Sequence, residues 1–191
     1  MNVYDFDGTI YNGDSTIDLY LFMVKRHPGI LRHFPSACIS AVKHKLGRCT
    51  TTQWKEIFFR FLPGIPDMEA ELRIFWDKNL GKIMKWYKDQ KQDTDVIISA
   101  SPAFLLEIPI KELGLKSLIA SEVDIRSGKF SSENCKGKEK VKRFRAIFPD
   151  EKVDRFYSDS LSDLPMAELA EKAYLCRKGR LTEWDVRKGT K

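Results

Sequence analysis

The stretch Val3-Tyr4-Asp5-Phe6-Asp7-Gly8-Thr9, near the start of this 191-residue chain, decides the fold. Residues 3–6 favour a β-strand and Asp7-Gly8-Thr9 is typical of a turn, so a brief strand should end in two acids. Side chains two residues apart leave a strand on the same side, and two close carboxylates repel when both are ionised. Such a pair needs a cation or a shared proton, unless it only marks an ordinary Asp-Gly turn.

After about residue 90, short apolar runs alternate with helical patterns. The run 96–98 is β-branched and ends at Ser99, as expected of a buried strand in a parallel sheet. Further strands are expected at 117–120, 153–157 and 173–176, helices at 102–113, 136–148 and 162–172, and a small hairpin at 124–130. This alternation predicts an α/β fold, with a parallel sheet flanked by helices. The basic tail from Arg177 onward is expected to fray.

The segment between the first two strands is predicted to be a helical insertion. Residues from about 15 to 86 show helical periodicity, and prolines and glycines divide them into about four helices. The length of the chain suits one domain, or a small core that carries an insertion. We therefore expect a core of residues 1–12 and 89–191, with a helical domain of residues 13–88 inserted after the first strand.

Polar side chains follow the predicted strands at the place where a binding site is expected. Ligands of open α/β sheets lie at the carboxyl ends of the strands. Asp5 and Asp7 follow the first strand, Ser99 follows the second, and Asp159 and Asp163 follow a later one. Hard carboxylate oxygens suit Mg²⁺, so this edge of the sheet is the predicted active site.

Four motifs, in this order, resemble those of the haloacid dehalogenase superfamily, in its branch near the phosphoserine phosphatases. They are Asp5-Phe6-Asp7-Gly8-Thr9-Ile10, Ser99 in Ile-Ile-Ser-Ala-Ser-Pro, Lys136 in Glu-Asn-Cys-Lys-Gly, and Asp159 with Asp163 in Tyr-Ser-Asp-Ser-Leu-Ser-Asp. The resemblance covers residues 1–12 and 90–176. It implies a Rossmann-like core with a helical cap at 13–88, and a Mg²⁺-dependent phosphatase that works through an aspartyl phosphate on Asp5.

The resemblance also implies how the motif residues share the chemistry. Asp5 would attack phosphorus and bind the metal through its other oxygen. Asp7 would protonate the leaving oxygen and later deprotonate the attacking water. Ser99, with Ala100 beside it, would hold the phosphoryl oxygens, and one lysine would neutralise their charge.

The same resemblance implies the metal ligands. Asp159 would complete a Mg²⁺ site formed by Asp5 and the backbone carbonyl of Asp7. Asp163 would be a further ligand or would support the others from behind.

Several assignments stay open between two residues or two roles. Lys136 matches the wording of the phosphoserine phosphatases and is preferred, but Lys140 matches other relatives and, four residues on, would share its helix face. Ser101 could replace Ser99. Thr9 and Asp14 are candidates for contact with the substrate, although Asp14 could equally be a helix N-cap.

The substrate is predicted only as a small phosphorylated metabolite. Phosphoserine phosphatases carry Ser-Gly-Gly where this chain has Ser99-Ala100-Ser101, and their cap glutamate has at best Asp14 as a counterpart. A phosphotransferase or phosphomutase with the same intermediate is an alternative, as is a non-catalytic protein that binds anions or nucleic acid.

Charge and composition narrow the range of possible binding partners. The net charge is +6, and residues 25–48 hold six Lys or Arg, three His and no acid. Such a stretch could hold nucleic acid, anionic lipid or an acidic substrate, but we expect a solvated helical face without a partner. The start of the chain shows no secretory signal, no apolar stretch is long enough to span a bilayer, and four scattered cysteines suggest reduced thiols. We expect a cytoplasmic protein without membrane or nucleic-acid partners, and no oligomeric state is predicted.

Overall fold

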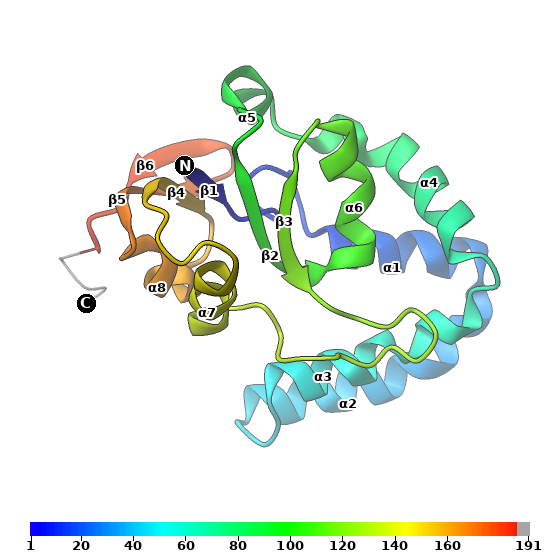
Figure 1. The fold of residues 1–191 in the computed structure, drawn as a ribbon. Coiled ribbons are helices and arrows are strands. Elements are labelled where there is room, and N and C mark those ends of the chain that lie inside the picture. The colour runs from blue at the N-terminus through cyan, green and yellow to red at the C-terminus, as the bar shows by residue number, and fades with distance from the viewer. Residues whose placement is uncertain (187–191) are drawn as a thin grey trace.

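The computed structural model describes residues 1–186 and contains a six-stranded sheet with the strand order β3-β2-β1-β4-β5-β6 (Figure 1). The strands are β1 (Asn2–Tyr4), β2 (Val96–Pro102), β3 (Ser117–Ser121), β4 (Val153–Ser158), β5 (Ala170–Arg177) and β6 (Arg180–Glu183). β1 to β5 pair in parallel, and β6 pairs with β5 in antiparallel orientation. The predicted α/β class is therefore confirmed, with β1 between β2 and β4.

Helices cover both faces of this sheet. The α-helices are α1 (Ser15–Arg26), α2 (Phe34–Lys45), α3 (Thr51–Phe58), α4 (Met68–Asn79), α5 (Lys85–Gln90), α6 (Ala103–Glu112), α7 (Lys138–Ile147) and α8 (Leu164–Ala167). Short 3₁₀ turns are η1 (Pro28–His33), η2 (Phe59–Gly64), η3 (Leu80–Lys82) and η4 (Leu161–Asp163). One hydrophobic cluster joins the sheet to α1, α4, α5 and α6, and a second joins it to α7 and α8.

Successive strand residues enter opposite clusters. Val3 and Phe156 belong to the cluster with α7 and α8, whereas Tyr4 and Tyr157 belong to the other. Because both faces of the sheet are covered, its inner strands are continuous apolar runs rather than alternating ones. This explains why the run 96–98 identifies a strand although it has no polar face.

A column of tyrosines ties the last helix of the insertion to the central strands. Tyr4, Tyr157 and Tyr174 lie opposite one another on β1, β4 and β5, and their rings stack at centroid distances of 4.5 and 4.9 Å. Trp86 of α5 packs against Tyr4 at 6.3 Å. Each aromatic pair adds roughly 0.5–1.5 kcal/mol beyond its buried area. These contacts fix the strand that leads directly into Asp5.

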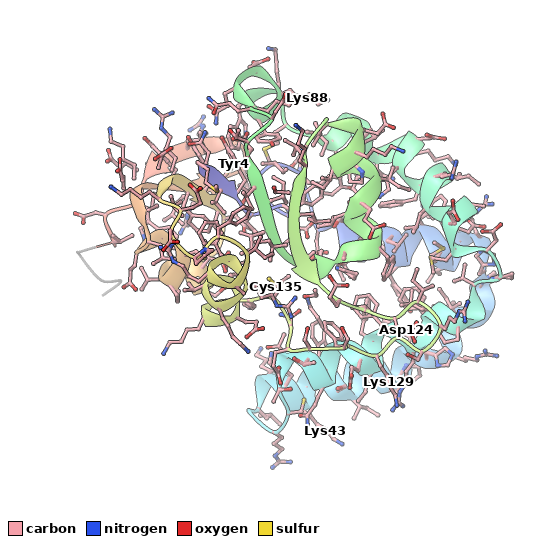
Figure 2. The ribbon with its side chains drawn as sticks, in the orientation of Figure 1. Tyr4, Lys43, Lys88, Asp124, Lys129 and Cys135 are labelled. Atoms are coloured by element: carbon pink, nitrogen blue, oxygen red, sulfur yellow. The ribbon has the colours of Figure 1, made fainter. Side chains whose placement is uncertain are left out.

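The helices between β1 and β2 pack in two different places. α4 packs on α6, where Trp76 Nε1 donates to the Leu105 carbonyl at 2.7 Å. α2 and α3 pack against each other beyond the carboxyl ends of β2 and β3 (Figure 1). The connection from β3 to α7 runs beside α3, in the region where Figure 2 labels Asp124 and Lys129. The amide of Phe130 donates to Glu56 Oε1 at 3.1 Å, which joins this connection to α3.

Two predictions near the C-terminus were wrong. The helix expected at 162–172 is only the short turn η4 and α8, because β5 already begins at Ala170. The tail does not fray directly after Arg177, since Arg180–Glu183 forms β6 against β5. The part of that tail at 187–191 lies outside the described residues.

No helix within residues 1–186 is both long and apolar enough to cross a membrane.

Candidate active site

The predicted acids lie together at the carboxyl edge of the sheet. β1 ends at Tyr4, and the Asp5 amide donates to the Tyr157 carbonyl of β4 at 2.8 Å, which extends the strand pairing into the motif. Asp5, Asp7, Asp159 and Asp163 all line one cavity of about 600 Å³. Ser99, Ala100, Ser101, Asp14, Lys136 and Lys140 also line it. The cavity therefore collects every predicted site residue except Thr9.

A buried lysine lies between two of the acids. Lys140 Nζ is 2.7 Å from both Asp5 Oδ1 and Asp163 Oδ2, and Ser158 Oγ donates to the same Asp163 oxygen at 2.9 Å. Burial opposes the charge on Lys140, but Asp5 and Asp163 outweigh it, so the pKa of Lys140 is raised. The charged form of Lys140 is therefore favoured beside the Asp5 carboxylate.

Burial also affects Asp5. It raises the pKa of the Asp5 carboxyl to about 7; the Lys140 charge opposes this shift, while Asp163 and Asp7 add to it. The Lys140 ammonium thus faces several close carboxylates, so the side chains around Asp5 carry an excess of negative charge.

Asp7 is held by two donors. The Ser15 amide donates to Asp7 Oδ1 at 2.6 Å, and Ser101 Oγ donates to Oδ2 at 2.5 Å. Burial raises the pKa of Asp7 to about 6 despite the opposing hydrogen bond from Ser101. A carboxyl group with a pKa near neutrality can both give and take a proton, which general acid–base catalysis requires.

Gly8 makes room for Asp159. A Cβ on Gly8 would lie 2.1 Å from Asp159 Oδ2, and the φ of Gly8 is +67°, which favours glycine. Burial, followed by repulsion from Asp163, raises the pKa of Asp159. The Asp-Gly turn of the first motif therefore leaves room for a third acid, Asp159, to line the same cavity as Asp5 and Asp7.

The two serines in the last part of β2, Ser99 and Ser101, have different neighbours, and the strand continues past both of them to Pro102. Ser99 is 1% exposed, and its Oγ accepts from the Ser101 amide at 3.1 Å. Ser101 Oγ is bound to Asp7 and lies 3.0 Å from Thr16 Oγ1. The structure thus assigns Ser101 to the support of Asp7 and leaves Ser99 as the serine predicted to meet a phosphoryl group.

The preference for Lys136 over Lys140 is not supported by the geometry. α7 begins at Lys138, after Gly137 with a φ of +58°, so Lys136 is not on the helix and the two lysines do not share a helical face. Lys136 is exposed and lines the outer cavity, whereas Lys140 is 1% exposed and reaches Asp5.

The two further substrate-contact candidates also differ. Asp14 caps α1, since its Oδ1 accepts from the Ile17 amide at 2.9 Å, and it lines the cavity as well. Both readings of Asp14 are therefore compatible with its position. Thr9 is fully buried and does not line the cavity, and its backbone carbonyl accepts from the Cys176 thiol instead.

Lys55 was missed by sequence reasoning. It lies on α3, and its Nζ donates to the Ala100 carbonyl at 2.7 Å and to Asn134 Oδ1 at 2.8 Å. Burial lowers the pKa of Lys55 to about 8, even though Asp14 and Asp7 favour its charge. None of the six Lys or Arg within residues 25–48, the stretch that could attract an acidic substrate, lines the cavity. The aromatic residues Trp54 and Phe58 near Lys55 would identify the partly buried face of α3, but not the direction in which the Lys55 side chain points.

The donor atoms fit a hard divalent cation. Within residues 1–186, no three His, Cys, Asp or Glu side chains are arranged to hold a metal ion. Mg²⁺ in phosphoryl-transfer sites uses one or two carboxylates with water and substrate oxygens, so it does not need such a cluster. Asp5 and Asp159 offer oxygen donors only, as would the carbonyl of Asp7. Burial is the main cause of the raised pKa values of Asp5 and Asp159, and repulsion from neighbouring carboxylates, which a cation would offset, adds to it.

The chain was then compared with known proteins. It is 26% identical to protein CicA of Caulobacter vibrioides, over 93% of this chain and 86% of that protein. A protein of unknown function from Bordetella pertussis has a similar structure, with a TM-score of 0.74, 19% identity and coverage of 91% of this chain and 87% of the other. A phosphoserine phosphatase solved as an analogue of its phospho-aspartyl intermediate gives a TM-score of 0.54, 17% identity and coverage of 90% and 83%.

At these identities the solved structures establish the fold alone. The sequence model of the haloacid dehalogenase-like hydrolases matches residues 3–168, which include most of β1, all of β2 to β4, the helical segment and the five acids that line the cavity. The chain belongs to the haloacid dehalogenase-like hydrolase family.

Proposed function

We propose that this protein is a Mg²⁺-dependent phosphatase that hydrolyses a small phosphate monoester through an aspartyl phosphate on Asp5. The observation that carries the proposal is the different environment of the two acids of the first motif. Asp5 Oδ1 lies 2.7 Å from the ammonium of Lys140, whereas the two oxygens of Asp7 are held by neutral donors, the Ser15 amide and the Ser101 hydroxyl. The first arrangement suits an ionised nucleophile and the second suits an acid and base.

In the first step, a carboxylate oxygen of Asp5 forms a bond to phosphorus and the bond from phosphorus to the ester oxygen breaks. Asp7 gives its proton to that oxygen, so the organic group leaves as a neutral alcohol. In the second step, Asp7 takes a proton from water, the water oxygen bonds to phosphorus, and the Asp5 carboxylate is released with inorganic phosphate.

Other residues of the cavity stabilise charge during both steps. Lys140 and Ser99 would donate to the phosphoryl oxygens. Asp5, Asp159 and the Asp7 carbonyl would hold Mg²⁺, which screens the repulsion between a phosphate dianion and an anionic nucleophile. Asp163 would keep Lys140 in place rather than bind the metal, because its Oδ2 already accepts from both Lys140 and Ser158.

We further propose that the helical segment 13–88 acts as the cap. α2 and α3 contribute His44, Trp54, Lys55 and Phe58 to the wall opposite the acids. This wall would exclude water and contact the organic part of the substrate. The buried ammonium of Lys55 supports an anionic substrate.

The proposal is tested by release of phosphate from p-nitrophenyl phosphate and from a panel of phosphorylated metabolites, with Mg²⁺ or with EDTA. We expect turnover that EDTA stops and Mg²⁺ restores. Acid quenching during turnover of a ³²P-labelled substrate should trap radioactive protein in the wild type and none in Asp5→Asn. Asp150→Asn, an exposed acid far from the cavity, is the matched control and should keep full activity.

An Asp5→Asn protein that still turns over would refute the proposed nucleophile. Turnover that rises when alcohols are added, with transfer of phosphate to them, would indicate the alternative phosphotransferase. Absence of turnover by folded, Mg²⁺-replete protein on every compound would favour a binding protein.

A further inference from the structure

The exposed apolar side chains of this protein are concentrated on the helical segment. Within residues 1–186, ten large hydrophobic residues are exposed, and seven of them lie between Ile17 and Leu46. The most exposed of these are Ile39 and Val42, both at 59%, and Leu46 at 62%. Single exposed apolar residues are ordinary, but a group of them within one helix needs an explanation.

These residues form one stripe along α2. Pro35, Cys38, Ile39, Val42 and Leu46 follow one another at intervals of three or four residues or stand side by side, so they share one face of the helix. All five are exposed. We call this stripe the α2 outer face. α2 lies at the end of the molecule beyond the carboxyl edge of the sheet, and Figure 2 labels Lys43 there.

The opposite face of α2 is polar or small, although it is the buried one. Ser40 is 2% exposed, and Ala37, Ala41 and His44 are partly buried. His44 stacks on Trp54 of α3 at 5.9 Å and lines the cavity. An ordinary surface helix buries its apolar stripe and exposes its polar face. α2 does the reverse, so core packing does not account for its apolar stripe.

The charge around the α2 outer face has one sign. Residues 19–55 contain no Asp or Glu. At 3.6 residues per turn, Lys43 falls on one side of the stripe and Lys45 on the other, and both are exposed. Arg32 and Arg48 lie beyond its two ends and are also exposed. The stripe is therefore apolar along its centre and basic around its rim.

We propose that the α2 outer face docks on an anionic lipid surface, with Ile39, Val42 and Leu46 inserted at the level of the headgroups. An interfacial helix combines a continuous apolar face with lysines and arginines that meet acidic headgroups, and α2 has both features. Nucleic acid would pair with the basic rim but would leave the apolar centre in water. The helix lies along the surface and does not span the bilayer, which agrees with the absence of a spanning helix in residues 1–186.

The inference does not depend on the proposed phosphatase activity, because it concerns the side of α2 that faces away from the cavity. The opposite side of the helix carries His44 into that cavity. Docking would therefore place the cavity about one helix diameter, roughly 10 Å, from the headgroups.

The test is co-sedimentation of the full chain with vesicles of phosphatidylcholine alone, or of equal parts of phosphatidylcholine and phosphatidylglycerol. We expect binding to the second kind of vesicle that weakens as salt is added. The double variant Ile39→Ser/Val42→Ser should lose affinity about tenfold or more, since it keeps every charge and removes the apolar centre. Ile147→Ser, which changes an isoleucine of 57% exposure on α7, is the matched control and should bind like the wild type.

A probe at Cys38 tests insertion directly. Cys38 is exposed on the stripe, so it can carry an environment-sensitive nitrobenzoxadiazole dye. Its emission should shift to the blue on acidic vesicles, whereas the same dye at residue 147, in Cys38→Ser/Ile147→Cys, should not shift. Because both sites are exposed, the fold should tolerate these changes, and circular dichroism verifies this before binding is measured.

Four results would overturn the inference. They are no binding of folded protein to acidic vesicles, unchanged binding of Ile39→Ser/Val42→Ser, no spectral shift at Cys38, and a solution dimer that Ile39→Ser/Val42→Ser converts to monomers. Unchanged binding of the serine variant together with loss in Lys43→Gln/Lys45→Gln would show charge attraction without insertion. A dimer would show that a second copy of the chain covers the α2 outer face.

Discussion

The stability of this protein should depend on pH through Lys55, a partly buried lysine of α3. Its pKa is about 8 in the folded chain, against 10.5 for a free lysine, because burial disfavours the charged form. Between these two values the unfolded chain binds more protons than the folded one, so stability rises with pH. Below pH 8 the fold carries the full cost of the buried charge, about 3 kcal/mol from the difference in pKa.

The experiment compares wild type with Lys55→Met in urea at pH 7 and at pH 9.5. Relative to the variant, the wild type should gain about 2 kcal/mol between these pH values, because part of the 3 kcal/mol remains until pH 10.5. With a urea dependence of about 2 kcal/mol per molar, this is a shift of about 1 M in the difference between midpoints.

Lys116→Met, which removes an exposed lysine, is the matched control. A free-energy difference between wild type and Lys55→Met that stays constant from pH 7 to pH 9.5 would refute the reasoning. It would mean that Lys55 keeps its proton in the folded protein throughout this range.

Two further predictions concern the acids of the cavity. Lys140→Met should destabilise the fold by about 3–5 kcal/mol in thermal or urea unfolding, because it leaves Asp5 and Asp163 buried without their ammonium. Lys136→Met, at an exposed position, should stay within about 0.5 kcal/mol of wild type, and equal effects of the two changes would contradict the placement of Lys140. Gly8→Ala should cost at least about 1 kcal/mol for its left-handed backbone and should also reduce phosphate release, since the new Cβ would displace Asp159. Gly114→Ala has nearly the same φ, +69° against +67°, but meets nothing within 4 Å, so it should lose stability and keep activity; equal activity of the two variants would show that the contact with Asp159 is harmless.

The sheet and its acids could be predicted from sequence because they depend on local patterns. Strand 96–98 is marked by its β-branched residues, and parallel pairing brings the strand ends to one edge wherever the helices lie. This alone gathers Asp5, Ser99 and Asp159 around one cavity. The resemblance to the family motifs added the order in which these residues follow one another along the chain.

The positions of the lysines could not be predicted in the same way. The choice between Lys136 and Lys140 depends on where α7 begins, and the positive φ of Gly137 delays that start to Lys138. Lys55 reaches the cavity only because α3 lies across it, which follows from packing between distant segments. Its partners are Ala100 of β2 and Asn134 in the connection from β3 to α7, and neither pattern nor spacing relates them to α3.

The start of β5 shows another limit of prediction from the sequence. Residues 170–172 were predicted to end a helix, but they pair with β4 through the register Val153 to Ala170 and Arg155 to Lys172. A polar residue such as Lys172 is as compatible with a strand near the edge of a sheet as with a helix. Pairing with β4, which the local sequence does not show, makes this segment a strand.

The central place of β1 affects how the chain is made on the ribosome. β1 leaves the ribosome before the other strands of this sheet, and both its neighbours come much later, since Tyr4 pairs with Ile97 of β2 and with Tyr157 of β4. At a synthesis rate of about 5–20 residues per second, β1 waits on the order of ten seconds for β4. The helices that follow it have local contacts to form in the meantime, whereas β1 has none. The site at the carboxyl end of β1 therefore cannot be completed until β4 has been synthesised, and shortened chains released before β4 should expose an unpaired strand to chaperones.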